Sequence, residues 1–164
     1  MRVFANGDKT DGTMQKAMQG IAVPYLFDLP RTSRLYRFVD IRRGPHRLVA
    51  NGPWWIESDY FDKLSTFAER HGYSLEFCAR LFLAVLYEYS EVTGYVSAEV
   101  TKPLKAWKGQ GKVQYSSGKD PRDSQRTIPM QSINMVYQLY IPGLHPGSPL
   151  LDEAFGNIQY HKLK

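Results

Sequence analysis

Alternating apolar and polar positions mark three strands along the chain. Residues 35–41 are rich in aromatic and β-branched side chains, which suit a half-buried strand. Residues 95–101 alternate polar and apolar positions, the period of a strand with one solvated face. Residues 135–141, bounded by Asn134 and Pro142, have the same alternation. Strands are therefore predicted in all three segments.

Helical spacing predicts two helices between the first and second strands. Ser58 can cap a helix that continues to about residue 70, with Gly72 as its stop. Ser74 can cap a second helix, whose broad apolar face must pack on a sheet or another helix before Gly94 ends it. The sequence thus predicts a single α+β domain, in which short antiparallel strands form a split or curved sheet with two central helices.

The segments between these elements carry turn and loop signals. Residues 21–27 predict a short strand or an extended arm, limited by Pro24 to a sheet edge. A short turn is predicted at 103–107. Residues 105–114 interleave lysines with glycines and predict a solvated hairpin turn, with a phosphate or RNA contact loop as the weaker alternative. The polar residues 115–126 predict a mobile surface loop.

The ends of the chain carry weaker signals. Residues 1–20 lack the apolar stretch of a secretory signal, so we expect a flexible lead before a single domain at 21–164. Residues 160–164 are expected to be a surface tail. No apolar run reaches the length of a membrane span, so we expect no membrane partner. The expected location is the cytoplasm, or a larger secreted effector that delivers this domain.

The net charge, the single cysteine and the four histidines limit the partners and sites that can be expected. Lys and Arg number 21 against 16 Asp and Glu, a net charge of +5, which favours nucleic acid, an anionic molecule such as NAD, or an acidic protein as partner. The single cysteine, Cys78, excludes an intramolecular disulfide and fits a buried thiol. The four histidines lack the short spacings of zinc ligands, so no metal site is expected.

An arginine in the first strand is the most informative charged residue. Arg37 lies among aromatic and β-branched neighbours, where a guanidinium needs an acceptor. A structural partner is the ordinary interpretation, and an anionic ligand is the functional one.

The order of features after Arg37 is similar to that of a known family. Arg37, the run from Asn51 through two tryptophans to Trp55, and Ser58 opening a helix resemble the first half of the ADP-ribosyltransferase fold. The resemblance implies NAD as substrate, with Arg37 on its phosphate or ribose and Trp54 or Trp55 against the nicotinamide.

The family's usual Glu-x-Glu or Gln-x-Glu pair does not occur in this chain. On the strand at 95–101, Ser97 and Glu99 share one face, which in such a domain would border the NAD cleft with Glu99 as the acid. The ordinary alternative is a solvated strand face. Gln138 could replace one polar member of the pair, but an amide carries no negative charge, so a carboxylate must come from elsewhere. The carboxylate candidates are Glu57, Glu99, Asp152 and Glu153.

The resemblance predicts ADP-ribosyl transfer to a macromolecular acceptor, protein or nucleic acid, by a toxin or effector domain, with an acidic inhibitor or immunity protein as a possible partner. Two other functions are open. One is a metal-independent ribonuclease toxin with a histidine base. The other is a non-enzymatic basic module that binds nucleic acid or an acidic protein through the following side chains: Lys105, Lys108, Lys112, Lys119, Arg122 and Arg126.

Overall fold

A computed structural model describes most of the chain. The described residues are 4–7, 10, 12–40, 42, 50–76, 78–79, 92–110, 114–120, 123–130 and 137–163, those at 114–120 and 123–130 by their backbone alone.

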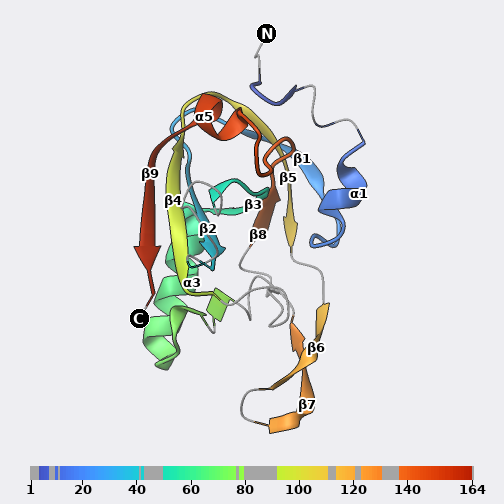
Figure 1. Cartoon of the computed structure of the whole chain (residues 1–164), viewed down its shortest axis with the longest axis vertical. Helices are drawn as coiled ribbons and strands as arrows, with labels where there is room; N and C mark the ends of the chain where they lie inside the picture. The colour runs from blue at the N-terminus through green and yellow to red at the C-terminus, as the bar shows by residue number, and fades with distance from the viewer. Residues whose placement is uncertain are drawn as a thin grey trace.

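Seven strands form one antiparallel sheet in the order β1-β5-β8-β3-β2-β4-β9, and a two-stranded hairpin projects from its end (Figure 1). The strands of the sheet are β1 (Tyr25–Leu29), β2 (Arg34–Val39), β3 (Trp54–Glu57), β4 (Gly94–Val100), β5 (Leu104–Gln110), β8 (Tyr137–Tyr140) and β9 (Phe155–Lys162). The hairpin consists of β6 (Gln114–Asp120) and β7 (Asp123–Met130). The described helices are α1 (Met14–Ala17), α3 (Ser58–His71) and α5 (Leu150–Ala154). The chain is a single α+β domain, as predicted.

The three strands predicted at 35–41, 95–101 and 135–141 are confirmed as β2, β4 and β8, with residues 135 and 136 outside the described part of the chain. The edge position expected from Pro24 is also confirmed, because β1 begins at Tyr25 and closes one side of the sheet. Residues 75, 76, 78 and 79 are helical and Cys78 is buried, in keeping with the second predicted helix, most of which lies outside the described residues.

Four predictions of irregular structure are wrong. The turn predicted at 103–107 and most of the hairpin turn predicted at 105–114 are strand β5, and the surface loop predicted at 115–126 falls on β6 and β7. The expected tail at 160–164 begins within β9, the second edge strand. Gly94 opens β4 and does not end a helix.

Helix α3 begins directly after β3, without a capping side chain. Glu57 is the N-cap and makes no side-chain cap hydrogen bond, so Ser58 is the first helical residue and not the predicted cap. Gly72 ends the helix in the left-handed conformation with φ 67°, as predicted, and its N–H donates to Ala68 O and Glu69 O. Because α3 follows β3 directly, Glu57 lies at the N-terminal end of the helix.

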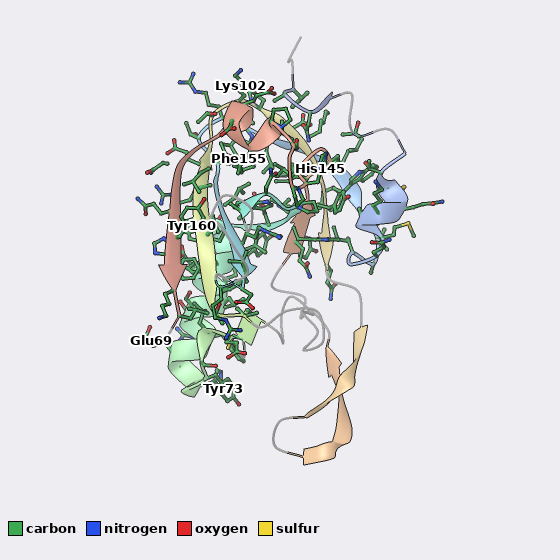
Figure 2. All side chains as sticks on the ribbon, viewed as in Figure 1. Glu69, Tyr73, Lys102, His145, Phe155 and Tyr160 are labelled. Carbon is green, nitrogen blue, oxygen red and sulfur yellow. The ribbon has the colours of Figure 1, made fainter. Side chains whose placement is uncertain are left out.

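Figure 2 shows Glu69 and Tyr73 at the C-terminal end of α3 and Lys102 beside α5.

The sheet is nearly split between β2 and β3. Only two residue pairs join these strands, Leu35 with Glu57 and Tyr36 with Ile56, whereas β2 pairs with β4 along its whole length. The strands diverge beyond Tyr36, which leaves the next side chain, Arg37, at the split. β3 also joins β8 through only two residue pairs, so the seven strands form one open sheet that is narrow on both sides of β3.

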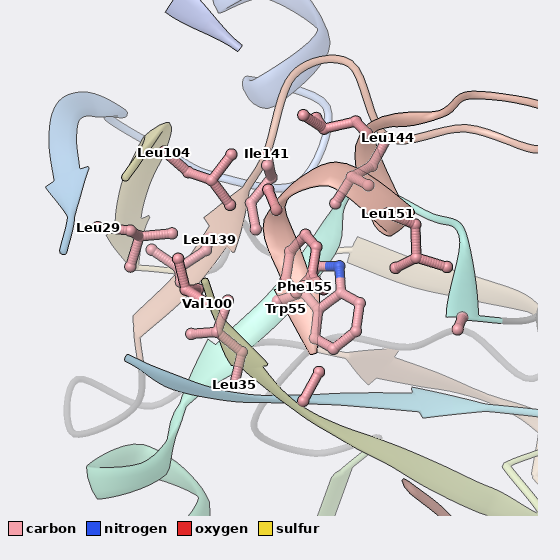
Figure 3. Close-up of a cluster of buried hydrophobic side chains, with 14 of the residues drawn as sticks. Leu29, Leu35, Trp55, Val100, Leu104, Leu139, Ile141, Leu144, Leu151 and Phe155 are labelled. Carbon is pink, nitrogen blue, oxygen red and sulfur yellow. The ribbon is translucent and has the colours of Figure 1, made fainter. Parts of the chain in front are cut away.

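The hydrophobic core fills the space between the two parts of the sheet and α5 (Figure 3). Trp55 is 2% exposed and its ring stacks on Phe155, with centroids 5.3 Å apart. Its Nε1 donates to Gly52 O at 2.7 Å, so the indole is both packed and hydrogen-bonded. Leu35, Leu139 and other buried aliphatic side chains surround these rings.

The N-terminal segment is attached to the sheet by a buried amide. Asn6 is fully buried, and its Nδ2 donates to Lys105 O and Pro142 O, both at 2.8 Å. Its Oδ1 accepts a hydrogen bond from Lys105 N, also at 2.8 Å. A second attachment joins Trp107 Nε1 to Thr13 Oγ1 at 3.0 Å. None of the helices in the described part of the chain is long and apolar enough to cross a membrane.

Asp40 makes the stability of the fold depend on pH. Arg42 donates two side-chain hydrogen bonds to its carboxylate, and Thr93 Oγ1 donates a third at 2.9 Å. The hydrogen bonds from Arg42 outweigh burial and, with the Arg42 N–H and Thr93, hold the pKa of Asp40 well below its usual value. A carboxylate with a depressed pKa stabilises the fold above its unfolded pKa and loses this contribution as the pH falls.

Replacing Asp40 with asparagine is expected to cost about 1 to 2 kcal/mol of unfolding free energy at pH 7, since Arg42 is largely exposed and solvent weakens the pair. The difference between wild type and variant should shrink below about pH 4 as the wild-type carboxylate gains a proton. Urea unfolding at pH 7, 4 and 3 measures this difference. A difference that stays constant over this range would contradict the assignment.

Candidate active site

Arg37 lies at the split in the sheet and supports the chain that leads into β3. Its side chain is half-buried, and Nη1 donates to Trp54 O at 3.1 Å. The guanidinium packs against Gly52 so closely that a Cβ at this position would overlap it. Burial lowers the pKa of Arg37 to about 10, which still leaves it charged at neutral pH. These contacts fit the structural interpretation of the strand arginine.

Ser97 and Glu99 lie on the opposite face of the sheet from Arg37. The β2–β4 register pairs Arg37 with Val96, Tyr36 with Ser97, and Arg34 with Glu99. Directly opposed residues in an antiparallel pair share a face, and successive residues alternate. Ser97 is buried and its Oγ lies 3.0 Å from His161 Nε2, whose ring stacks on Tyr95. The structure therefore does not bring Ser97 and Glu99 together with Arg37.

The two tryptophans and Gln138 also lie in different surroundings. Trp55 belongs to the core. Trp54 packs edge-on against Tyr140, at 5.0 Å between ring centroids, and its indole touches Gly20. Gln138 is buried and two residues from Tyr140 on β8, so it shares the face of Trp54. The pairing of Tyr36 with both Ile56 and Ser97 puts Trp54 and Gln138 on the same sheet face as Ser97, but β3 and β2 lie between β8 and β4.

Among the four carboxylate candidates, Glu57 and Glu99 are both half-buried, and Glu57 also forms an ion pair with a lysine from another strand. Asp152 and Glu153 are exposed on α5. The Glu57 Oε1 atom lies 2.6 Å from Lys108 Nζ, and the two side chains are 25% and 12% exposed. Lys108 comes from β5, and it reaches Glu57 across β8, the strand between β5 and β3.

Aromatic side chains from three elements, β1, α3 and β8, gather around Lys108. Lys108 Nζ lies 4.1 Å from the ring centroid of Phe27 on β1 and 5.4 Å from that of Tyr60 on α3. Tyr60 in turn stacks on Tyr137 of β8, with centroids 5.7 Å apart and planes at 7°. Tyr25 lies opposite Lys108 in the β1–β5 ladder. We call these six residues the Glu57 cluster: Tyr25, Phe27, Glu57, Tyr60, Lys108 and Tyr137.

The cluster is electrostatically coupled. Burial alone would lower the pKa of Lys108, but the hydrogen bond and charge of Glu57, with smaller effects of Tyr60 and Tyr25, raise it. Burial raises the pKa of Tyr60, and Glu57, Tyr25 and Tyr137 act in the same direction against Lys108. Lys108 therefore stays protonated, and Tyr60 keeps its hydroxyl proton at neutral pH.

This arrangement can stabilise positive charge. A half-buried carboxylate beside aromatic faces favours a cation on a substrate, because both groups present negative potential in a partly dehydrated setting. The flat tyrosine rings can also pack against a planar heterocycle. In the described residues, no group of three His, Cys, Asp or Glu side chains could hold a metal ion.

Sequence reasoning named Glu57 and Lys108 but assigned them to separate functions. Glu57 and Tyr60 are three residues apart across a strand–helix junction, a spacing that places them side by side. Tyr25 and Phe27 alternate on one strand face. The missing information was the strand order, which alone brings β1, β5, β8 and β3 together.

Comparison with known proteins adds little to this geometry. No protein-family model matches the chain, and no curated protein matches it. One solved structure with some likeness is Rhs1-CT in complex with its cognate immunity protein RhsI1. The TM-score is 0.48 at 10% sequence identity, over 85% of this chain and 81% of that chain. A likeness at this level carries no inference about what the present chain does.

Proposed function

We propose that the chain is an ADP-ribosyltransferase-like toxin or effector domain that cleaves NAD at Glu57 and transfers ADP-ribose to a macromolecular acceptor. The observation that carries this proposal is the half-buried Glu57 carboxylate, which pairs with Lys108 Nζ where that ammonium lies over the rings of Phe27 and Tyr60. The resemblance of residues 35–58 to the first half of that fold supports the choice of NAD as substrate.

The proposed reaction needs a carboxylate close to C1′ of the ribose. The bond between C1′ of the ribose and the nicotinamide nitrogen breaks, and its electron pair neutralises the pyridinium ring. C1′ becomes cation-like, and a nearby carboxylate stabilises the developing charge. A nucleophile of the acceptor, or water, then bonds to C1′ and loses its proton to solvent. Glu57 takes the role that the sequence resemblance left open among four carboxylates.

The other residues have supporting roles. Tyr60 and Tyr137 offer aromatic faces to the planar rings of the dinucleotide. Arg37 is a positioning residue, since it holds the backbone at Gly52 and Trp54 that leads into Glu57. Contact of Arg37 with an NAD phosphate stays a prediction. The net charge of +5 favours an anionic acceptor and an acidic inhibitor or immunity protein.

The Glu57–Lys108 pair also favours a second function, metal-independent RNA cleavage. Glu57 would accept the proton of a ribose 2′-hydroxyl, and Lys108 would stabilise the negative charge on the phosphate. The two functions differ in what they consume. One needs NAD, and the other needs only RNA.

The deciding experiment incubates the purified protein with NAD in buffer and in cell extract, and separately with labelled RNA without NAD. We expect nicotinamide to be released from NAD, above the level in extract alone, while the RNA stays intact. Cleaved RNA with intact NAD would favour the ribonuclease, and no reaction with either would leave a basic binding module. In that case binding to nucleic acid should weaken steeply with added salt.

A further inference from the structure

The ammonium group of Lys108 sits in a site built for a cation. Its Nζ is 2.6 Å from Glu57 Oε1, 4.1 Å from the Phe27 ring centroid and 5.4 Å from the Tyr60 ring centroid. A carboxylate with flanking aromatic faces is the combination that proteins use to bind organic cations. The cation that fills this site is Lys108, a residue of the same protein.

The Lys108 side chain can move out of this site more easily than a rigid side chain could. The lysine ammonium is a compact, strongly hydrated charge on a flexible four-carbon stem. Tyr25, which lies opposite Lys108 in the β1–β5 ladder, is 46% exposed, so the cluster borders solvent on the β1 side. Hydration of the released ammonium compensates part of the lost ion pair, as it does for other partly exposed pairs.

The substrate of the proposed reaction carries the same charge. The nicotinamide ring of NAD is a pyridinium cation until its bond to ribose breaks, and then it leaves as a neutral molecule. If Glu57 faced both the Lys108 ammonium and a substrate cation, one positive charge would remain uncompensated in a partly dehydrated site, which disfavours binding of both together. Binding of the pyridinium therefore competes with Lys108, whereas the neutral product competes poorly.

We propose that Lys108 is a built-in occupant of a cation site formed by Phe27, Tyr60 and Glu57, and that a pyridinium ring binds there by displacing it. The choice of a pyridinium rests on the proposed NAD reaction. The site itself rests on the contacts of Lys108. The apparent affinity equals the intrinsic affinity multiplied by the fraction of molecules in which the site is open. Lys108 therefore lowers the affinity for the cation as long as it occupies the site.

The experiment measures binding of 1-methylnicotinamide, a pyridinium that cannot react as NAD does, by titration calorimetry or by chemical-shift changes. Replacing Lys108 with methionine keeps the length of the side chain and removes its charge. We expect the dissociation constant to fall about tenfold or more in Lys108→Met, as it would if the site were open in a tenth of wild-type molecules. Neutral nicotinamide should bind weakly to both proteins, and Glu57→Gln in the Lys108→Met background should lose the gain.

Lys105→Met is a matched control. Lys105 lies on the same strand, its Nζ is 2.7 Å from Asp28 Oδ1 and 4.4 Å from the Phe4 ring centroid, and its loss changes the net charge equally. We expect no gain in affinity from this variant. The proposal is overturned if Lys108→Met binds the probe no more tightly than wild type, or if Lys105→Met gains as much.

A measurement on the wild-type protein covers the case in which Lys108→Met does not fold. Displaced from the cluster, Lys108 should react faster with an amine-acylating reagent at saturating probe, as mass spectrometry of the labelled peptide would show. An unchanged or slower reaction would overturn the proposal. Probe binding and lysine release without any nicotinamide release from NAD would instead keep the cation site and reject the proposed enzyme.

Discussion

Replacing Trp55 with alanine is expected to lower the free energy of unfolding by about 3 to 5 kcal/mol, a large part of the total for a domain of this size. The side chain is 2% exposed, stacks on Phe155, and donates a hydrogen bond to Gly52 O at 2.7 Å. The variant would leave a cavity between the two parts of the sheet and an unpaired carbonyl beside Arg37.

The adjacent tryptophan provides the control for this prediction. Trp54 is half-buried and meets Tyr140 edge-on, so Trp54→Ala removes a ring of the same size from the sheet face and not from the core. We expect a smaller cost, about 1 to 2 kcal/mol. Denaturant unfolding of both variants measures the difference. Equal losses in the two variants would contradict the placement of Trp55 at the centre of the core.

Glu57→Gln is expected to lower the rate of nicotinamide release from NAD by about 10²- to 10³-fold. The glutamine has nearly the shape of glutamate and keeps a polar oxygen beside Lys108, but it offers no negative charge to a cation-like ribose. The loss should appear in kcat, because the charge of the ribose develops only in the transition state, and KM should rise as well, because Glu57 also faces the substrate pyridinium in the proposed cation site. Thermal unfolding of the variant checks that the fold is intact.

Glu99→Gln makes the same chemical change on another part of the sheet. Glu99 pairs with Arg34 in the β2–β4 register, on the opposite strand face from Arg37. We expect this variant to retain the wild-type rate within about twofold, because Glu99 lies away from the reacting groups. A large loss in Glu99→Gln with a small one in Glu57→Gln would restore the acid suggested by the resemblance.

Local patterns predicted the elements whose side chains have one clear environment. The residue types of β2, the alternation in β4 and β8, and the stop signal of α3 at Gly72 are all local in the sequence. These elements could be predicted because each signal depends on neighbours in sequence.

Strand β5 was missed because its glycine and lysines indicated a turn. A Cβ at Gly109 would come within 2.6 Å of Ile21 Cγ2 and 2.9 Å of Val23 O, so glycine admits the preceding segment of chain at this strand position. The lysines of β5 each have a carboxylate partner from another strand. The glycine and the lysines of β5 are therefore both explained by tertiary contacts, which the sequence alone does not reveal.

The candidate site was predictable only in part for the same reason. Glu57 could be named as one of four carboxylates, and Lys108 as one of several basic residues. Their pairing needs β8 between β5 and β3, and the enclosing rings need β1 beside β5. Such neighbours, separated by about 50 residues or more in the chain, follow from the strand order and not from any local pattern.

The most direct test compares initial rates of nicotinamide release from NAD by wild type, Glu57→Gln and Glu99→Gln, at equal protein concentration and saturating NAD. The geometry of the Glu57 cluster predicts release by wild type and by Glu99→Gln, and a rate near background for Glu57→Gln. Release by Glu57→Gln at the wild-type rate would contradict the assignment of the reaction to this carboxylate. Absence of release by the wild type would contradict the NAD reaction itself.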